Sequence, residues 1–166
     1  DPAGLRQPGQ ERDQCRTPMQ WSSAPNAGFS PPNVPGTWLP ISENYQTNNV
    51  ESHLKDPSSL LILYKKLLKL RRKYPTLQIG DYQPVNGAPD HCYTYTRQTK
   101  NDIFLISLNF SNQQTLVELH PSQRGKCLLS TYLDRKGEID LNHFYLRPNE
   151  GIIIACKSNK SKGSSE

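Results

Sequence analysis

A leucine-rich stretch, residues 57–73, sets the first limit on the fold. Its apolar residues recur every three or four positions, which is the spacing of one helix face. Asp56 and Pro57 suit a helix start, while cationic residues gather before Pro75, as expected at a helix end. We therefore predict a helix over 57–73 with a face that must be buried, formed by Leu60, Leu61, Leu63, Tyr64, Leu67, Leu68 and Leu70.

After Ile79 the pattern changes to short runs rich in β-branched and aromatic residues, typical of strands. Turn-forming pairs such as Asn86-Gly87 and Ser111-Asn112 separate these runs. Because the links are short and contain no helix, the sheet should be antiparallel. The predicted strands are 92–96, 103–110, 115–119, 127–133, 144–146 and 152–156.

The chain before Lys55 has no clear periodicity and holds eight of the 14 prolines. Its distinctive stretch is Arg16-Thr17-Pro18-Met19-Gln20-Trp21, continued by Asn26-Ala27-Gly28-Phe29. Proline removes backbone donors, so the stretch should be a loop. Apolar side chains in a loop are costly to expose, which leaves two interpretations: a loop held down by its aromatics, or a loop that lines a pocket. We expect anchoring contacts from Phe29, Trp38, Leu39, Ile41 and Tyr45.

These motifs occur together in the α-amylase superfamily. Five motifs of this chain resemble, in this order, the C-terminal end of α-glucosidases and oligo-1,6-glucosidases. They are the loop motif, Thr37-Trp38-Leu39-Pro40, Asn49-Val50, the leucine-rich helix and Leu108-Asn109-Phe110-Ser111. The resemblance implies a mixed α and β fold: the long loop after the eighth strand of a (β/α)₈ barrel, the last barrel helix, and an antiparallel β-sandwich. It implies a division into 1–76 (loop and helix), 77–157 (sandwich) and 158–166, a Lys/Ser tail expected to be disordered.

The resemblance also implies roles for residues. Arg16 corresponds to an arginine at the mouth of the sugar pocket, which makes it the candidate substrate-binding residue, with Met19, Gln20, Trp21 and Phe29 shaping the loop. A salt bridge that only anchors the loop is the competing role for Arg16. The family usually has an aspartate where this chain has Ser22, and this removes a local charge partner.

A retaining glycosidase needs two carboxyl groups about 5 Å apart on a rigid scaffold. The family places its catalytic carboxylates before the segment that corresponds to Arg16, and none of those motifs occurs here. We therefore predict no catalytic residue in this chain and read its acids as solvated carboxylates. The chain opens at Asp1 without a methionine, and we expect it to be part of a longer protein.

Composition argues against several other functions. The net charge of +5 arises largely from the helix end and the tail, so we predict no nucleic-acid partner. No apolar run could cross a membrane. Scattered cysteines and histidines lack the spacing of a metal site, and no glycine-rich phosphate loop occurs, so we expect free thiols, no metal and no cofactor. The sequence predicts no particular cellular compartment.

Two other functions agree with the same sequence. The heavy subunits of heteromeric amino-acid transporters resemble these enzymes but do not catalyse. The other alternative is that the sandwich serves as a carbohydrate-binding module, but Trp21 and Trp38 lie outside it and its tyrosines are also compatible with a place in the core: Tyr93, Tyr95, Tyr132 and Tyr145. If the chain is part of an enzyme, we expect its partner to be an oligosaccharide substrate bound by the complete enzyme. A helix face without its barrel also predicts self-association, unless the sandwich or the loop covers it.

Overall fold

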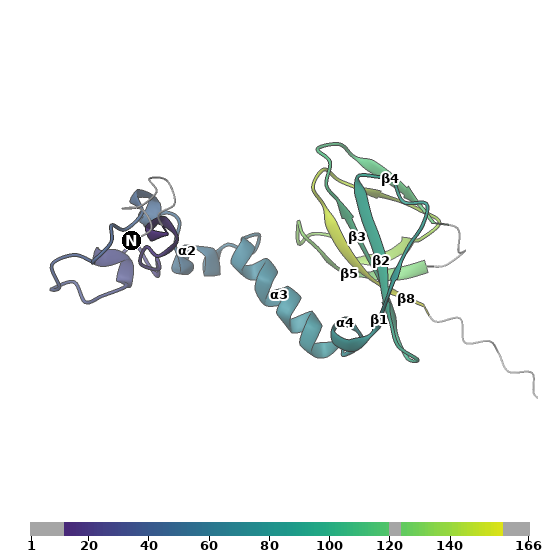
Figure 1. Ribbon diagram of the computed structural model, residues 1–166, viewed down its shortest axis with the longest axis horizontal. Coiled ribbons are helices and arrows are strands. Elements are labelled where there is room, and N and C mark those ends of the chain that lie inside the picture. Colours follow the sequence, from purple (N-terminus) through teal and green to yellow (C-terminus); the bar gives the residue numbers. More distant parts are fainter. Residues whose placement is uncertain (1–11, 120–123, 158–166) are drawn as a thin grey trace, which may run out of the picture. The chain divides into compact units, whose positions relative to one another are not determined.

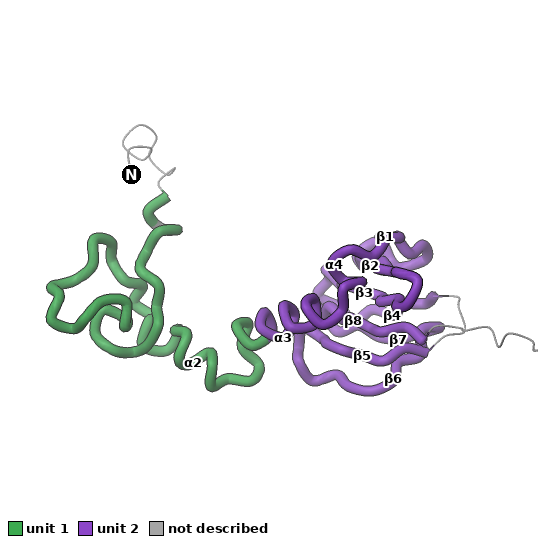
Figure 2. The backbone as a smooth tube through the Cα atoms, turned by 90° about the horizontal axis from the view of Figure 1, so that it is seen from below, with its two compact units in different colours: residues 1–62 green, residues 63–166 purple. Residues whose placement is uncertain are grey.

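The computed structural model describes residues 12–119 and 124–157 (Figure 1). The predicted disordered tail, 158–166, lies outside the described residues. The chain forms two compact units, 1–62 and 63–166 (Figure 2). The boundary between the compact units falls inside the predicted helix. The division between residues 76 and 77 is a different one, between the barrel segment and the sandwich domain of the family, and it stays a prediction.

The first unit is mostly loop, as predicted. Three short 3-10 helices, η1 (Asp13–Cys15), η2 (Pro25–Gly28) and η3 (Glu43–Gln46), precede one turn and a half of α-helix, α2 (Val50–Lys55). The sequence reading missed α2, although Asn49 is a strong cap for it. The Asn49 side chain accepts from Ser52 N at 2.8 Å and donates to Tyr45 O at 2.8 Å. Asn49 is buried and thus joins α2 to the preceding loop.

The leucine-rich stretch forms α3 (Leu60–Lys73). Its predicted end at Lys73 is confirmed, but its predicted start at Pro57 is three residues too early. Asp56 closes a turn instead, because its carboxylate accepts from Ser58 N at 2.8 Å. Ser59 takes the capping role and accepts from Ile62 N at 3.3 Å. A short helix, α4 (Thr76–Ile79), follows α3 and was not predicted.

The rest of the second unit is antiparallel sheet, which confirms the predicted fold class. One sheet has six strands in the order β1-β2-β3-β8-β5-β6, and the other pairs β4 with β7. All six predicted strands exist; β1 and β6, at the two edges of the larger sheet, were missed. The strands are β1 (Asp81–Pro84), β2 (Cys92–Gln98), β3 (Ile103–Asn109), β4 (Thr115–Glu118), β5 (Arg124–Ser130), β6 (Gly137–Asp140), β7 (His143–Leu146) and β8 (Gly151–Cys156).

The main core lies between these two sheets. Alternate residues of β3 and β8 point inward, and the strand pair β4 and β7 covers them. The largest contributors that are almost fully buried are Leu105, Val117, Phe144, Leu146, Ile152 and Ile154. This is the two-layer packing expected of a β-sandwich.

The opposite face of the six-stranded sheet meets the second half of α3. Tyr74, just after the helix, packs its ring 5.0 Å from that of the buried Phe104 on β3. Within the helix, Leu63 is buried, but Tyr64 and Leu68 are 59% and 52% exposed. The sandwich therefore covers only part of the predicted apolar face.

Candidate functional site

Arg16, the predicted sugar-binding residue, lies directly after η1. Its backbone N–H donates to Asp13 O at 3.0 Å and closes that turn, and its side chain is exposed. A long cationic side chain at the end of a tight turn can reach outward from the loop. Its position is therefore compatible with ligand binding, and its role in sugar binding stays a prediction.

A left-handed turn gives the loop its shape. Asn26, Ala27 and Gly28 have φ values of 56°, 53° and 65°, which non-glycine residues rarely adopt and which cost energy. The turn is held from both sides. The carbonyl of Ala27 accepts from the N–H groups of Trp21 and Ser22 at 2.9 and 3.1 Å, and the Asn26 amide donates to Pro31 O and Val34 O at 3.2 and 3.0 Å.

The motif is also fixed to α2. The first N–H groups of this helix, from Val50 and Glu51, donate to the carbonyls of Gln20 and Trp21, both at 3.0 Å. The Gln20 side chain donates to Asn44 Oδ1 at 2.9 Å. The N–H groups of the first helical turn, which have no partner within the helix, thus bind the backbone of the Arg16–Trp21 motif.

The apolar side chains of the loop do not all pack as expected. Met19, Trp21 and Phe29 are each about half exposed, at 52%, 51% and 50%. Trp38, predicted to anchor the loop, is 77% exposed, so that prediction is wrong. Backbone and amide hydrogen bonds hold the loop, and this leaves aromatic surface available beside it.

Gly28 is the glycine that this turn requires. A methyl group built on Gly28 would lie 2.5 Å from Ser22 Oγ, and the φ of 65° is itself unfavourable for alanine. We expect Gly28→Ala to destabilise the loop by about 1–2 kcal/mol. Limited proteolysis within residues 12–55 should accelerate, while Gly36→Ala, at φ 79° but with no neighbour within 4 Å, should show the backbone cost alone. Equal acceleration in both variants would contradict the role of the Ser22 contact.

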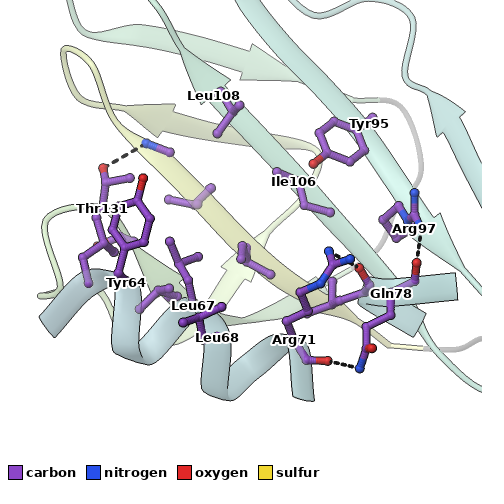
Figure 3. A pocket seen from close by; sticks show the side chains of 17 residues that line it. Tyr64, Leu67, Leu68, Arg71, Gln78, Tyr95, Arg97, Ile106, Leu108 and Thr131 are labelled. Carbon is purple, nitrogen blue, oxygen red and sulfur yellow. Dashed lines mark hydrogen bonds between the residues drawn. The ribbon is translucent and has the colours of Figure 1, made fainter. Parts of the chain in front are cut away.

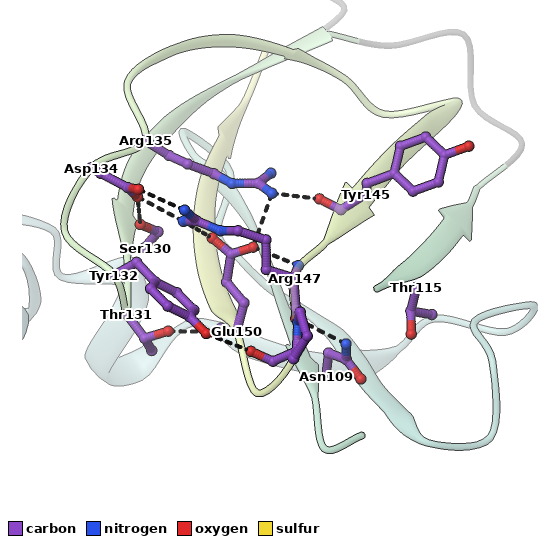
Figure 4. A network of polar contacts seen from close by, with 12 residues as sticks. Asn109, Thr115, Ser130, Thr131, Tyr132, Asp134, Arg135, Tyr145, Arg147 and Glu150 are labelled. Atoms are coloured by element: carbon purple, nitrogen blue, oxygen red, sulfur yellow. Dashed lines mark hydrogen bonds and ion pairs between the residues drawn. The ribbon is translucent and has the colours of Figure 1, made fainter. Parts of the chain in front are cut away.

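The densest polar network lies elsewhere, in the turns after β5 and β7 (Figure 4). Arg147 binds Asp134 through two hydrogen bonds of 2.6 and 2.7 Å and binds Glu150 at 2.6 Å. Glu150, whose side chain is fully buried, also contacts Arg135 at 2.9 Å. The guanidinium of Arg147 lies 4.2 Å from the centre of the Tyr132 ring, a cation–π contact.

This network is neutralised and structural in character. Hydrogen bonds donated by Arg147 hold the pKa of the Asp134 carboxyl well below its usual range, and the same bonds, together with the one donated to Glu150, raise the pKa of Arg147. A carboxyl group that stays ionised cannot serve as a general acid near neutral pH. The sequence did not reveal this cluster, because its acids and bases come from two separate turns that only the pairing of the strands brings together.

The described residues contain no cluster of three or more histidine, cysteine or acidic side chains suited to a metal ion. None of their helices combines the length and apolarity that crossing a bilayer requires. All four cysteines are free thiols, as predicted, and burial raises the pKa of Cys92, Cys127 and Cys156.

Comparisons with known proteins give one consistent answer. Residues 4–80 match the family model of the α-amylase catalytic domain. The oligo-1,6-glucosidase of Parageobacillus thermoglucosidasius is 36% identical over 149 residues, which are 88% of this chain and 26% of that protein. The chain belongs to the α-amylase family. Among solved structures, the trehalose-6-phosphate hydrolase of Bacillus licheniformis matches with a TM-score of 0.73 and 31% identity, covering 89% of this chain and 27% of that one.

A trehalulose synthase from Pseudomonas mesoacidophila matches with a TM-score of 0.74 and 27% identity, over 89% of this chain and 26% of that one. The chain thus spans about a quarter of the length of these α-amylase family relatives. The catalytic-domain match ends at Gly80, between α4 and β1. The loop, α2, α3 and α4 therefore correspond to the catalytic domain, and the strands lie beyond the match.

One cluster of aromatic residues in this α-amylase family chain was not predicted from the sequence. Tyr95, on the outer face of the large sheet, has its ring centre 5.3 Å from those of both Tyr82 and Tyr93. The hydroxyl groups of Tyr82 and Tyr93 are 2.9 Å apart. The sequence did not show this cluster, because it depends on the pairing of the missed edge strand β1 with β2.

Proposed function

We propose that this chain is the part of an α-glucosidase-type glycoside hydrolase that contains the loop after the last barrel strand, the final barrel helix and the β-sandwich. The whole enzyme would act on short α-glucosides. The observation that carries the proposal is the 36% identity to an oligo-1,6-glucosidase over 149 residues, because this match covers 88% of the chain and so is longer than either compact unit alone.

In this proposal the catalytic acids lie outside these 166 residues. Retaining glycoside hydrolysis proceeds through an attack by a carboxylate and proton transfer by a second carboxyl group. Within the described residues, Asp134 and Glu150 are bridged by Arg147, and the pKa of Asp134 is lowered. That environment favours an ion network over acid–base chemistry. The residues of this chain would then contribute the pocket mouth and structural support.

Arg16 is the residue proposed to contact sugar. Its guanidinium offers a planar fork of donors for hydroxyl or carboxylate oxygens. It is exposed and follows a hydrogen-bonded turn, and the half-exposed Trp21 and Phe29 belong to the same loop. Together they would supply a charged donor and the aromatic surface on which sugar rings commonly stack.

The first experiment is an assay of the isolated chain with an aryl α-glucoside. We expect no turnover above that of a heat-denatured sample. Reproducible turnover that disappears on denaturation would show that the chain holds its own catalytic carboxylates. The proposal would then be wrong in its central point.

The role of Arg16 needs a complete active site. We expect Arg16→Ala to lower kcat/KM for an aryl α-glucoside about 10- to 100-fold in a hybrid enzyme, where this chain replaces the matched quarter of the P. thermoglucosidasius enzyme, because a charge-assisted hydrogen bond is lost. Arg72→Ala, on the exposed face of α3, is the matched control and should leave kcat/KM unchanged. Equal kcat/KM for Arg16→Ala and the parent hybrid would assign Arg16 an anchoring role.

The tyrosine cluster favours a second candidate function, carbohydrate binding by the sandwich. Tyr82 and Tyr93 are 43% and 48% exposed, so their rings form a surface on which sugar could stack. We expect Tyr93→Ala to abolish retardation of the chain in maltodextrin affinity gels. Tyr145→Ala, which removes a ring of similar exposure from the smaller sheet, is the control. Identical mobility with and without maltodextrin would rule out this function.

A further inference from the structure

Asn49 is a buried polar residue in a part of the chain that is mostly loop. Its side chain is 5% exposed, accepts from Ser52 N at 2.8 Å, and donates to Tyr45 O and Gln46 O at 2.8 and 3.4 Å. Ser52 completes a reciprocal cap, because its hydroxyl accepts from Asn49 N at 3.3 Å. These bonds fix the place at which α2 begins.

The helix α2 is too short to be stable by its own backbone hydrogen bonds. It has six residues, whereas helices shorter than about 12 residues are marginal in water. Its ion pair, Glu51 with Lys55 at 2.7 Å, is exposed, so solvent screens it and it contributes little. The Asn49 cap is therefore the strongest local support of α2, and its loss should open the first turn.

The first turn of α2 in turn holds the loop motif. The N–H groups of Val50 and Glu51 donate to Gln20 O and Trp21 O, both at 3.0 Å. The N–H of Trp21 donates to Ala27 O at 2.9 Å, so α2 holds Trp21 on one side and the left-handed turn holds it on the other. The Trp21 side chain is 51% exposed, and packing of its ring cannot readily replace these backbone bonds.

A stiff connection couples Arg16 to these bonds. Arg16 lies four residues before Gln20, and the buried Pro18 stands between them. Proline fixes its own φ and restricts the residue before it, so Thr17 and Pro18 can absorb little of a displacement. If Gln20 loses its bond to α2, Arg16 should move with it.

We propose that Asn49 is a positioning residue for the loop that carries Arg16. By fixing the start of α2, it holds the N–H groups of Val50 and Glu51 where they bind the loop, and it thereby sets the place of Arg16. Asn49 acts through these N–H groups without contacting a ligand itself. The consequence for sugar binding rests on the proposed function, whereas the positioning of the loop does not.

Hydrogen exchange of the full chain, followed residue by residue by NMR, tests the positioning without any ligand. In Asn49→Ala we expect the amides of Trp21 and Ser22 to exchange about tenfold faster, because the lost cap raises the open fraction of α2. Asn49→Ser should restore slow exchange, since serine also caps a helix although it lacks the reach to Tyr45 O. Acceleration confined to the amides of α2 would overturn the proposal. Equal acceleration in Asn49→Ala and Asn49→Ser would also overturn it, because the bond to Tyr45 O would then be the cause.

Val50→Pro separates the loop from the helix. Proline is favoured at the first helical position, and Asn49 before it is already extended, at φ −149° and ψ 166°, as proline requires. We therefore expect α2 to remain, with slow exchange at His53, whose N–H donates to Asn49 O at 3.0 Å. The ring, however, takes the place of the N–H that binds Gln20 O, so the Trp21 amide should exchange about tenfold faster.

Val50→Ala is the matched control, because it shortens the side chain and keeps the N–H that binds Gln20 O. It should leave the exchange of the Trp21 amide unchanged. Exchange at the rate of the parent chain in Val50→Pro would show that α2 does not hold the loop, and the proposal would be wrong.

The second compact unit supplies the internal reference. Ile106 and Leu108 on β3 line a groove of about 570 Å³ between α3 and the outer face of the six-stranded sheet (Figure 3). Because β3 is paired on both sides, its amides should exchange slowly. Unchanged exchange in β3 would show that the Asn49 and Val50 variants act on the first unit alone.

The hybrid with the P. thermoglucosidasius enzyme tests the consequence for sugar. We expect Val50→Pro to raise KM for an aryl α-glucoside about 10-fold with a smaller change in kcat, the pattern of lost substrate binding. Val50→Ala should leave both constants unchanged. If hydrogen exchange changes as expected but KM does not, the positioning of the loop is supported and the sugar-binding role of Arg16 in the proposed function is wrong.

Discussion

Replacing Phe104 by alanine should lower the free energy of unfolding by about 3–5 kcal/mol, the usual loss for a fully buried phenylalanine. Phe104 is 1% exposed and contacts the Tyr74 ring at 5.0 Å, so its removal leaves a cavity where α3 joins the sheet. Neighbouring residues cannot close this space easily, because β3 is paired on both sides. Urea denaturation followed by circular dichroism would measure the loss.

Phe110→Ala is the matched control for this prediction. Phe110 follows the same strand but is 71% exposed, and its removal should cost less than about 0.5 kcal/mol. A difference between the two variants of under 1 kcal/mol would mean that Phe104 does not hold the helix end to the sheet. Because both variants replace phenylalanine by alanine, the difference in their free energies of unfolding reports the burial of the Phe104 ring.

The sequence predicted the elements whose physical cause is local. The leucines of α3 share one helix face, and alternating residues define the central strands, so both were found. The helix start was wrong because two cap candidates, Asp56 and Ser59, compete, and only the structure shows that Asp56 closes a separate turn. The edge strands β1 and β6 were missed because they are short and largely exposed, so they lack the buried pattern that marks a strand.

The candidate site was less predictable than the fold. Residue types suggested that aromatics would anchor the loop, yet its anchors include Asn26, Asn49 and the carbonyl of Ala27. Such contacts depend on a left-handed turn that Asn26 and Gly28 favour but Ala27 does not. Likewise, the groove and the tyrosine cluster come from strand pairing, which distant residues decide. Arg16 was found through resemblance to the family and through no local pattern.

A second large effect should follow from Arg147→Met. This change leaves the buried Glu150 with Arg135 as its remaining cation and removes the two bonds to Asp134 and the contact with Tyr132. Breaking one arm of a buried ion network leaves a charge poorly compensated, and we expect a loss of about 3 kcal/mol. Urea denaturation at pH 7 would measure it.

Lys157→Met provides the control for Arg147→Met. Lys157 also binds a carboxylate, Glu138, at 2.6 Å, but both side chains are more than half exposed. Solvent screens such a pair, so its loss should cost less than about 1 kcal/mol. Similar losses for the two variants would show that burial of Glu150 adds nothing to the network.

The same network predicts a pH dependence. Because Arg147 lowers the pKa of Asp134 in the folded state, the unfolded state takes up the proton first as the pH falls. The contribution of Asp134 to stability is therefore complete above the unfolded pKa of about 4 and declines as the pH falls toward the lower folded value. We expect Arg147→Met to flatten the fall in stability between about pH 5 and pH 2, as Asp134→Asn should also do. Parallel stability curves for Arg147→Met and the parent chain over this range would show that Arg147 is not the group that holds Asp134 ionised.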